Sequence, residues 1–286
     1  MIGRIFDISR GCTDDGPGLR TTVFLKGCNL SCPWCHNIEG KSFEPEIAYD
    51  VKACIDCGLC EQACPRQWTA EGWRHGCTAC GTCAAICPTR ARKLVGRDIT
   101  PDELVSEISR DMAFFLGTGG GVTFSGGEPL AQPNFLFACA GKLKELGIHL
   151  AVETSGYWPN RYVSNLVKLF DMILFDLKHV DPEKCRRSLG TDSQIALENL
   201  KSLIRSRLFI EVRITLIPGF NDANADLYAM ADWLKANPKI PPVRIQPFHR
   251  LAVSKQELFQ RAYAYAYFPP TPPARLRKAE QIFALR

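Results

Sequence analysis

The sequence predicts an α/β fold, either a partial (β/α)6 barrel or an open parallel sheet, interrupted by a small metal-binding insert. Short apolar segments alternate with amphipathic helical segments, which is typical of a parallel sheet covered by helices. Polar or glycine-rich loops follow six of the apolar segments. Eleven of the 14 cysteines lie between Cys28 and Cys87, and this crowding predicts the insert. A chain of 286 residues is long enough for one such barrel.

The elements follow in order along the chain. The β-branched segment 21–27 predicts the first strand. After the insert, Thr100 and Glu103 form a capping box with Pro101 at the first helical position, and this helix is expected to run to about residue 115. Strands are expected at residues 122–124, 148–153, 172–176, 208–217 and 243–247, and helices at 134–146, 160–170, 193–206 and 225–236. A proline-rich linker and a last amphipathic helix close the chain at 268–273 and 274–285.

The loops after the strands are expected to form the functional face. The carboxyl ends of parallel strands meet at one edge, and sites in such folds lie there. The six loops are residues 28–35, 125–129, 154–157, 177–179, 218–222 and 248–250.

Composition and charge limit the partners and the cellular compartment that we expect for this chain. The chain is 46% hydrophobic and 23% charged, which is an ordinary globular mix. No apolar run approaches the ~18 residues of a membrane span, and the N-terminus lacks the apolar core of a signal peptide. The net charge of +5 comes without a dense basic tract, so neither nucleic acid nor a membrane is an expected partner. A cytoplasmic location is expected, where thiols stay reduced and the cysteines bind metal rather than form disulfides.

The insert is predicted to be a bacterial-ferredoxin-like domain with two [4Fe-4S] clusters, at residues 47–92, between barrel segments 1–46 and 93–286. It contains the pattern C-x2-C-x2-C-x3-C-P twice. In two-cluster ferredoxins the fourth cysteine of each run ligates the other cluster. The first predicted ligand set is Cys54, Cys57, Cys60 and Cys87, and the second is Cys77, Cys80, Cys83 and Cys64. Zinc is the alternative metal. Electron transfer is the function expected of the pair, and a structural role is the alternative.

A second cysteine motif directly follows the first strand. Cys28, Cys32 and Cys35 have the spacing C-x3-C-x2-C. Three thiolates leave one iron of a four-iron cluster without a protein ligand, and an open position is what a substrate-activating metal site needs. A three-cysteine zinc site is the alternative.

This triplet resembles the signature of the radical S-adenosylmethionine superfamily, which has an aromatic residue where this chain has Trp34. The loop Ser125-Gly126-Gly127-Glu128-Pro129 is similar to the superfamily loop that binds the methionine amino group. The resemblance implies a radical S-adenosylmethionine type of partial barrel. It also implies that the open iron binds S-adenosylmethionine, that the reduced cluster cleaves it, and that a 5′-deoxyadenosyl radical forms.

Further motifs resemble the activating enzymes of glycyl radical enzymes, whose type member activates pyruvate formate-lyase. They are the sequence DGPGLR at residues 15–20, FLKGC at 24–28, CHN at 35–37, ETSGY at 153–157, DLK at 176–178, R-x4-P-G at 213–219 and PFH at 247–249. Several members of that family carry an eight-cysteine insert at this point, so the chain resembles the insert-bearing subgroup.

The resemblance implies roles for individual residues. Catalytic roles fall on Cys28, Cys32, Cys35, Asp176 and Lys178. Cofactor contacts fall on Trp34, Cys35, His36, Gly126, Gly127, Glu128, Thr154, Asp176, Leu177, Lys178, Arg213 and His249. Tyr228 stands where the type member has a cofactor-contacting histidine, and His249 is the substitute candidate. Glu153, Thr154 and Asp176 are the candidates for a monovalent-cation site. An ion pair at the end of the barrel is the alternative for Arg213.

Three functions remain open from the sequence. The first, favoured, is an activase whose partners are a glycyl radical enzyme, with the glycine of a C-terminal loop as substrate, and an electron donor such as flavodoxin or ferredoxin. The second is a radical S-adenosylmethionine enzyme acting on a small molecule, and the third is a plain ferredoxin-type electron carrier. His75, His149 and His179 are expected to be solvated. Cys12, Cys139 and Cys185 fit none of the motifs, and Cys139 is expected to be a buried thiol.

Overall fold

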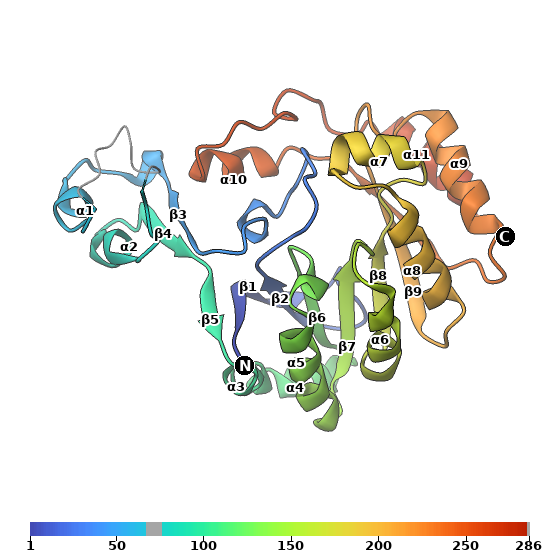
Figure 1. Cartoon of the computed structure of the whole chain (residues 1–286), viewed down its shortest axis with the longest axis horizontal. Helices are drawn as coiled ribbons and strands as arrows, with labels where there is room; N and C mark the ends of the chain where they lie inside the picture. Colours follow the sequence, from blue (N-terminus) through green and yellow to red (C-terminus); the bar gives the residue numbers. More distant parts are fainter. Residues whose placement is uncertain (67–75, 285–286) are drawn as a thin grey trace.

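A curved eight-stranded sheet, with helices packed on its outside, forms the body of the protein (Figure 1). We describe it from a computed structural model, in which residues 1–66 and 76–284 are described. The order of strands is β10-β9-β8-β7-β6-β2-β1-β5. Six neighbouring strands are parallel, as the sequence predicts, and they are β2 (Arg20–Leu25), β6 (Gly121–Gly126), β7 (His149–Thr154), β8 (Met172–Asp176), β9 (Phe209–Leu216) and β10 (Val243–Pro247).

Two strands that the sequence did not predict extend the sheet. β1 (Gly3–Cys12) lies antiparallel to β2, and β5 (Arg97–Ile99) lies antiparallel to β1 at the sheet edge. Ionic contacts then link the segment after β1 to the opposite edge, since Arg244 of β10 bonds Asp14 at 2.8 Å. The sheet therefore curls into a partial barrel, although β10 and β5 remain its two edges.

Helices connect the parallel strands and cover them. The predicted helix that begins at the Thr100 capping box is wrong in its extent. It is two helices, because Asp111 is buried at the break and its carboxylate accepts bonds from Arg10 and Thr21 of β1 and β2. The helices are α3 (Pro101–Ser109), α4 (Met112–Thr118), α5 (Pro133–Glu145), α6 (Val163–Leu169), α7 (Pro182–Leu189), α8 (Gln194–Ile204), α9 (Asn224–Lys235), α10 (Ala252–Leu258) and α11 (Pro273–Phe283), of which α7 and α10 were not predicted. Among the described residues, none of these helices has both the length and the apolar character that a membrane crossing demands.

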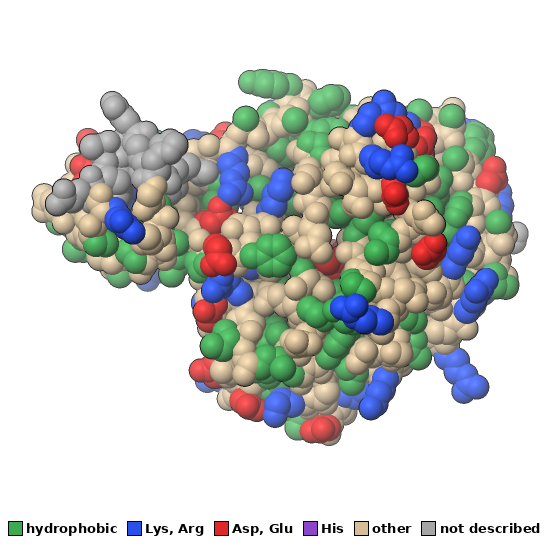
Figure 2. Space-filling view, viewed as in Figure 1, with side chains coloured by type: hydrophobic (Ala, Val, Ile, Leu, Met, Phe, Trp, Pro, Cys, Tyr) green, Lys and Arg blue, Asp and Glu red, His purple; other side chains and the backbone are tan. Residues whose placement is uncertain are grey.

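The cysteine-rich insert stands off the body as a lobe (Figures 1 and 2). Its base is a two-stranded antiparallel sheet of β3 (Glu46–Tyr49) and β4 (Arg92–Val95). Between them lie two short helices, α1 (Leu59–Gln62) and α2 (Thr82–Ile86).

A buried ionic junction ties this base to the barrel. The side chain of Lys26, fully buried at the end of β2, lies 3.6 Å from the Glu46 carboxylate of β3 and donates to the Glu39 carbonyl at 2.6 Å. Arg261, after α10, also pairs with Glu46. The predicted catalytic loop, the insert and the C-terminal segment therefore share one cluster of charges.

Candidate functional site

Cys28, Cys32 and Cys35 lie near one another at the carboxyl end of the barrel. Each is partly buried. Burial raises the pKa of Cys28 to about 11 and of Cys32 to about 12, and the neighbouring thiols raise these pKa values further. A bound metal ion would deprotonate such thiols. Three neighbouring, partly buried thiols are compatible with the predicted cluster.

Lys178 supplies the positive charge of this site. It follows β8 and forms an ion pair with Asp176. Burial alone would lower its pKa, but Asp176 and the thiols of Cys32 and Cys35 raise it, so Lys178 stays protonated. Asn221, from the loop after β9, donates to the Lys178 carbonyl at 3.2 Å. The predicted Asp176 and Lys178 are thus beside the triplet, with one Asp176 oxygen buried and without a hydrogen-bond partner in the described part of the chain.

Trp34 and His36 are held by the C-terminal segment. Trp34 is buried against Phe220 at 4.4 Å between ring centroids, and its carbonyl accepts a bond from the Tyr263 hydroxyl at 3.2 Å. The rings of His36 and His249 meet edge to face at 5.0 Å. Burial lowers the pKa of His36 to about 4, with help from Lys255 and His249, so His36 is neutral at pH 7.

Tyr228 occupies the sequence position of the expected histidine contact with the cofactor, and His249 is the predicted substitute. Tyr228 is 49% exposed on α9, whereas His249 lies beside His36. Of these two, His249 is the one that contacts the residue after Cys35.

The glycines of the Gly126-Gly127 loop are packed against the chain itself. A Cβ on Gly127 would lie 2.2 Å from the Gly27 carbonyl oxygen and 2.5 Å from that of Gly40. Gly126 has φ of +114°, a conformation that side chains disfavour. The Asn37 amide donates to the Gly126 carbonyl at 3.2 Å. The loop is therefore locked to the segment that carries the cysteines, and Asn37 is a site residue for which the sequence analysis had no role.

Glu128 is fully engaged within the protein. One carboxylate oxygen accepts bonds from Thr154 Oγ1 at 2.7 Å and the Leu130 amide at 3.2 Å. The other accepts from the Ser155 amide and hydroxyl at 2.9 and 2.7 Å. A carboxylate has about four acceptor sites, so its capacity is used. In this geometry Glu128 positions the loop after β7, and its predicted contact with an ammonium would have to displace one of these donors.

The expected solvation is wrong for His179. His179 is 2% exposed, with Nδ1 accepting from the Asp181 amide at 2.8 Å and Nε2 3.2 Å from Asp226 of α9. His149 is partly buried beside Arg20. His75 lies outside the described residues. The prediction for Cys139 is confirmed, since its side chain is fully buried in α5.

Arg213 lies inside the barrel, in a network of acidic groups. Its guanidinium is 3.1 Å from Glu153, 3.0 Å from Glu211 and 3.7 Å from Asp15. It also donates to the Asp14 carbonyl. These contacts match the ion-pair alternative for Arg213. They also engage Glu153, one of the three candidates for the cation site.

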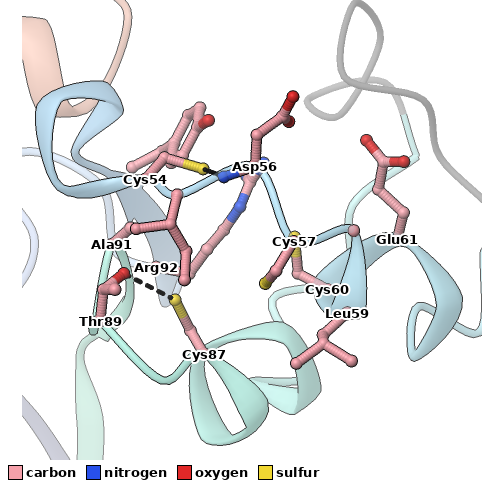
Figure 3. Close-up of a pocket in the computed structure, with 13 residues that line it drawn as sticks. Cys54, Asp56, Cys57, Leu59, Cys60, Glu61, Cys87, Thr89, Ala91 and Arg92 are labelled. Carbon is pink, nitrogen blue, oxygen red and sulfur yellow. Dashed lines mark hydrogen bonds between the residues drawn. The ribbon is translucent and has the colours of Figure 1, made fainter.

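The eight insert cysteines line two separate cavities. The first is lined by Cys54, Cys57, Cys60 and Cys87 (Figure 3). The second is lined by Cys64, Cys77, Cys80 and Cys83. The fourth cysteine of each run thus lines the cavity of the other run, as in the predicted ligand sets. Among the described residues, no three His, Cys, Asp or Glu side chains are arranged to hold a single metal ion.

Family profiles define the class of the protein, and one solved structure shares its fold. The profile described as "Radical SAM superfamily" matches residues 70–233, and the one described as "4Fe-4S single cluster domain" matches residues 14–65. A radical SAM methyltransferase from Sphaerobacter thermophilus shares the fold, with a TM-score of 0.54 at 15% identity over 98% of this chain and 74% of that chain. The chain is a radical S-adenosylmethionine protein, with an iron–sulfur cluster and S-adenosylmethionine as cofactors.

Curated relatives narrow the class to a family. The benzylsuccinate synthase activating enzyme of Thauera aromatica is 38% identical over 93% of this chain and 84% of its own length. The choline trimethylamine-lyase activating enzyme of Oleidesulfovibrio alaskensis is 35% identical, over 96% and 93% respectively. The trans-4-hydroxy-L-proline dehydratase activating enzyme of Clostridioides difficile is 33% identical, over 98% and 95%. The chain belongs to the family of glycyl radical enzyme activating enzymes.

The Glu128 contacts give a first testable prediction. In Glu128→Gln, an NH2 group replaces one carboxylate oxygen and cannot accept the hydrogen bonds that this oxygen now accepts. Each buried donor left unsatisfied in this way costs about 1–3 kcal/mol. We expect a lower free energy of unfolding in urea. The exposed Glu145→Gln of α5 is the matched control and should unfold like the wild type. A variant that is as stable as the wild type, but binds S-adenosylmethionine more weakly, would instead support the ammonium contact.

Proposed function

We propose that this chain activates a partner glycyl radical enzyme at a [4Fe-4S] cluster held by Cys28, Cys32 and Cys35. The observation that carries the proposal is the match to activating enzymes along 84–95% of their own length. Cys28, Cys32 and Cys35 would hold the cluster, which would supply the electron for reductive cleavage of S-adenosylmethionine and so allow removal of a hydrogen atom from a glycine of the partner.

The residues around the triplet bind, orient and exclude water. Lys178, protonated and beside Cys32 and Cys35, offsets the negative charge of the thiolates and is oriented by Asp176. Trp34 is buried against Phe220, and its backbone carbonyl accepts a bond from the Tyr263 hydroxyl, so its ring would help to exclude water. The Gly126-Gly127 backbone would contact the amino-acid end of the cofactor.

The cofactor contacts assigned to Leu177, Thr154, Arg213 and His249 stay predictions. Leu177 is buried between the two charged residues of its loop, and Thr154 Oγ1 already donates to Glu128. For the monovalent-cation site, the partnerless Asp176 oxygen is the supporting observation. Within this proposal the protein works anaerobically in the cytoplasm and takes electrons from a flavodoxin or ferredoxin.

We further propose that residues 47–92 form a ferredoxin-type domain with two more [4Fe-4S] clusters, three in the whole chain. The support is the four-cysteine lining of each cavity, with the fourth cysteine exchanged between the two runs. The domain would pass electrons toward the catalytic cluster, and the junction of Lys26 with Glu46 would hold it in place. Help in docking the partner enzyme is the alternative role.

Single serine substitutions test the insert. Cys57→Ser and Cys80→Ser each remove one ligand from a different cavity. We expect each variant to lose the iron of one cluster and the double variant to lose that of two, while cleavage with an artificial reductant persists. Iron analysis and S-adenosylmethionine cleavage with dithionite measure this. Unchanged iron in both single variants, or zinc in place of iron, would contradict the two-cluster domain.

The function itself is tested by forming the product radical. Anaerobic mixing of reduced protein, S-adenosylmethionine and a candidate glycyl radical enzyme should give a glycyl radical in the electron paramagnetic resonance spectrum. A partner whose loop glycine is replaced by alanine is the control and should give none. Cleavage without a protein radical in any candidate partner would favour a small-molecule substrate.

A further inference from the structure

Arg92 is a buried cation at the base of the cysteine-rich insert. Its exposed fraction is 4%. Lys52, Arg66 and Arg90, the other basic residues described in the insert, are exposed, and so is the adjoining Lys93. A buried guanidinium is little screened by water, so it acts strongly on charges that lie near it.

The structure holds the guanidinium in a fixed place. Arg92 of β4 pairs in register with Tyr49 of β3, and its Cζ lies 3.9 Å from the centroid of the Tyr49 ring. Such stacking fixes a planar guanidinium.

Arg92 lies against the first four-cysteine cavity. Together with Tyr49 it lines the cavity of Cys54 and its partners, and Figure 3 shows its side chain among those cysteines. Among the described residues that line this cavity, Arg92 is the only Lys or Arg. The second cavity is lined by the exposed Arg66 instead.

We propose that Arg92 is a positioning residue for redox function, which raises the reduction potential of the insert cluster predicted at Cys54, Cys57, Cys60 and Cys87. The inference rests on the proposed two-cluster domain. Each cluster takes up one electron with its four thiolate ligands unchanged, so its negative charge grows by one. A fixed cation in a poorly solvated place stabilises the reduced form more than the oxidised form. Exposed lysines nearby are screened by water and salt and act much less.

Three variants separate the effect of the buried charge from the effect of guanidinium stacking and from that of a nearby exposed charge. Arg92→Gln removes the buried charge, Arg92→Lys keeps a charge but not the stacked plane, and Lys93→Gln removes an exposed charge from the same strand. The readouts are iron content and the midpoint potentials of the insert clusters, obtained by anaerobic dithionite titration followed by electron paramagnetic resonance.

We expect Arg92→Gln to keep its iron and to become at least tenfold harder to reduce at the cluster of Cys54, which is a shift of about 59 mV to more negative potential. Arg92→Lys should shift less, and Lys93→Gln should match the wild type. Full iron with unchanged potentials in Arg92→Gln overturns the proposal, and so does an equal shift in Lys93→Gln.

If Arg92→Gln fails to bind iron in the insert, Tyr49→Leu provides a second test. It keeps the charge of Arg92 and removes the aromatic ring on which the guanidinium stacks. A more negative potential in Tyr49→Leu supports the proposal, and unchanged potentials overturn it. A wild-type protein with iron only at the Cys28 loop overturns the two-cluster domain, and this inference with it, and leaves the proposed activase function standing.

Discussion

Serine at Cys28, Cys32 or Cys35 should abolish the cleavage of S-adenosylmethionine. The three thiols are the protein's ligands for the catalytic cluster, and a serine hydroxyl does not replace a thiolate as an iron ligand. The loop has little freedom to compensate, because its backbone is tied down at the Ser31 amide, which donates to the Leu189 carbonyl at 3.0 Å, and at the Cys28 amide, which donates to that of Lys41 at 3.3 Å. Release of 5′-deoxyadenosine under anaerobic conditions with dithionite measures the loss.

The control for these variants is a cysteine outside the motifs. Cys12 is partly buried at the end of β1, and its thiol contacts the Ser9 carbonyl at 3.7 Å. Cys12→Ser should keep wild-type cleavage and iron. The triplet variants should lose one cluster's iron while the insert keeps its own. Wild-type cleavage of S-adenosylmethionine by Cys32→Ser would contradict the radical mechanism, whether or not the insert keeps its iron.

The parallel part of the fold could be predicted because its strands carry a strong local signal. β8 and β10 begin and end where expected, since each is a short apolar or β-branched run bounded by turn residues. β1 was missed because half of its side chains are polar and its exposed face hides the alternation. β5 has three residues, too few for any periodicity, and only its pairing with β1 defines it.

Some residues of the candidate site could be predicted from a local sequence pattern, and others could not. The cysteines could be found because their spacing along the chain already brings them together. The tight fit of Gly127 against Gly27 and Gly40 could not be, because it depends on three segments far apart in the sequence. His179 gave no local sign of burial either, since its partner Asp226 comes from α9. Long-range packing, rather than local pattern, decides these positions.

Arg213→Met should cost about 3–5 kcal/mol of folding free energy, as expected when one member of a buried ionic network is removed. The change leaves Glu153, Glu211 and Asp15 around an apolar side chain. Burial already raises the pKa of Glu153, and Arg213 is the main group that opposes the rise. Without it the Glu153 pKa rises further, so the charged form is disfavoured in the fold. The deficit should therefore grow as the pH rises above the pKa of an unfolded glutamate, about 4.3.

Urea unfolding at pH 5.5 and pH 8 measures this, with Arg244→Met as the matched control. Arg244 is half exposed and pairs with Asp14 at 2.8 Å, so its loss should cost about 0–1 kcal/mol at both pH values. The pair of variants also decides between the two roles that the sequence left open for Arg213. If Arg213→Met unfolds like the wild type at both pH values but binds S-adenosylmethionine more weakly, the residue acts on the cofactor. A large, pH-dependent loss of stability, absent in Arg244→Met, identifies it as the cation that neutralises the acidic interior of the barrel.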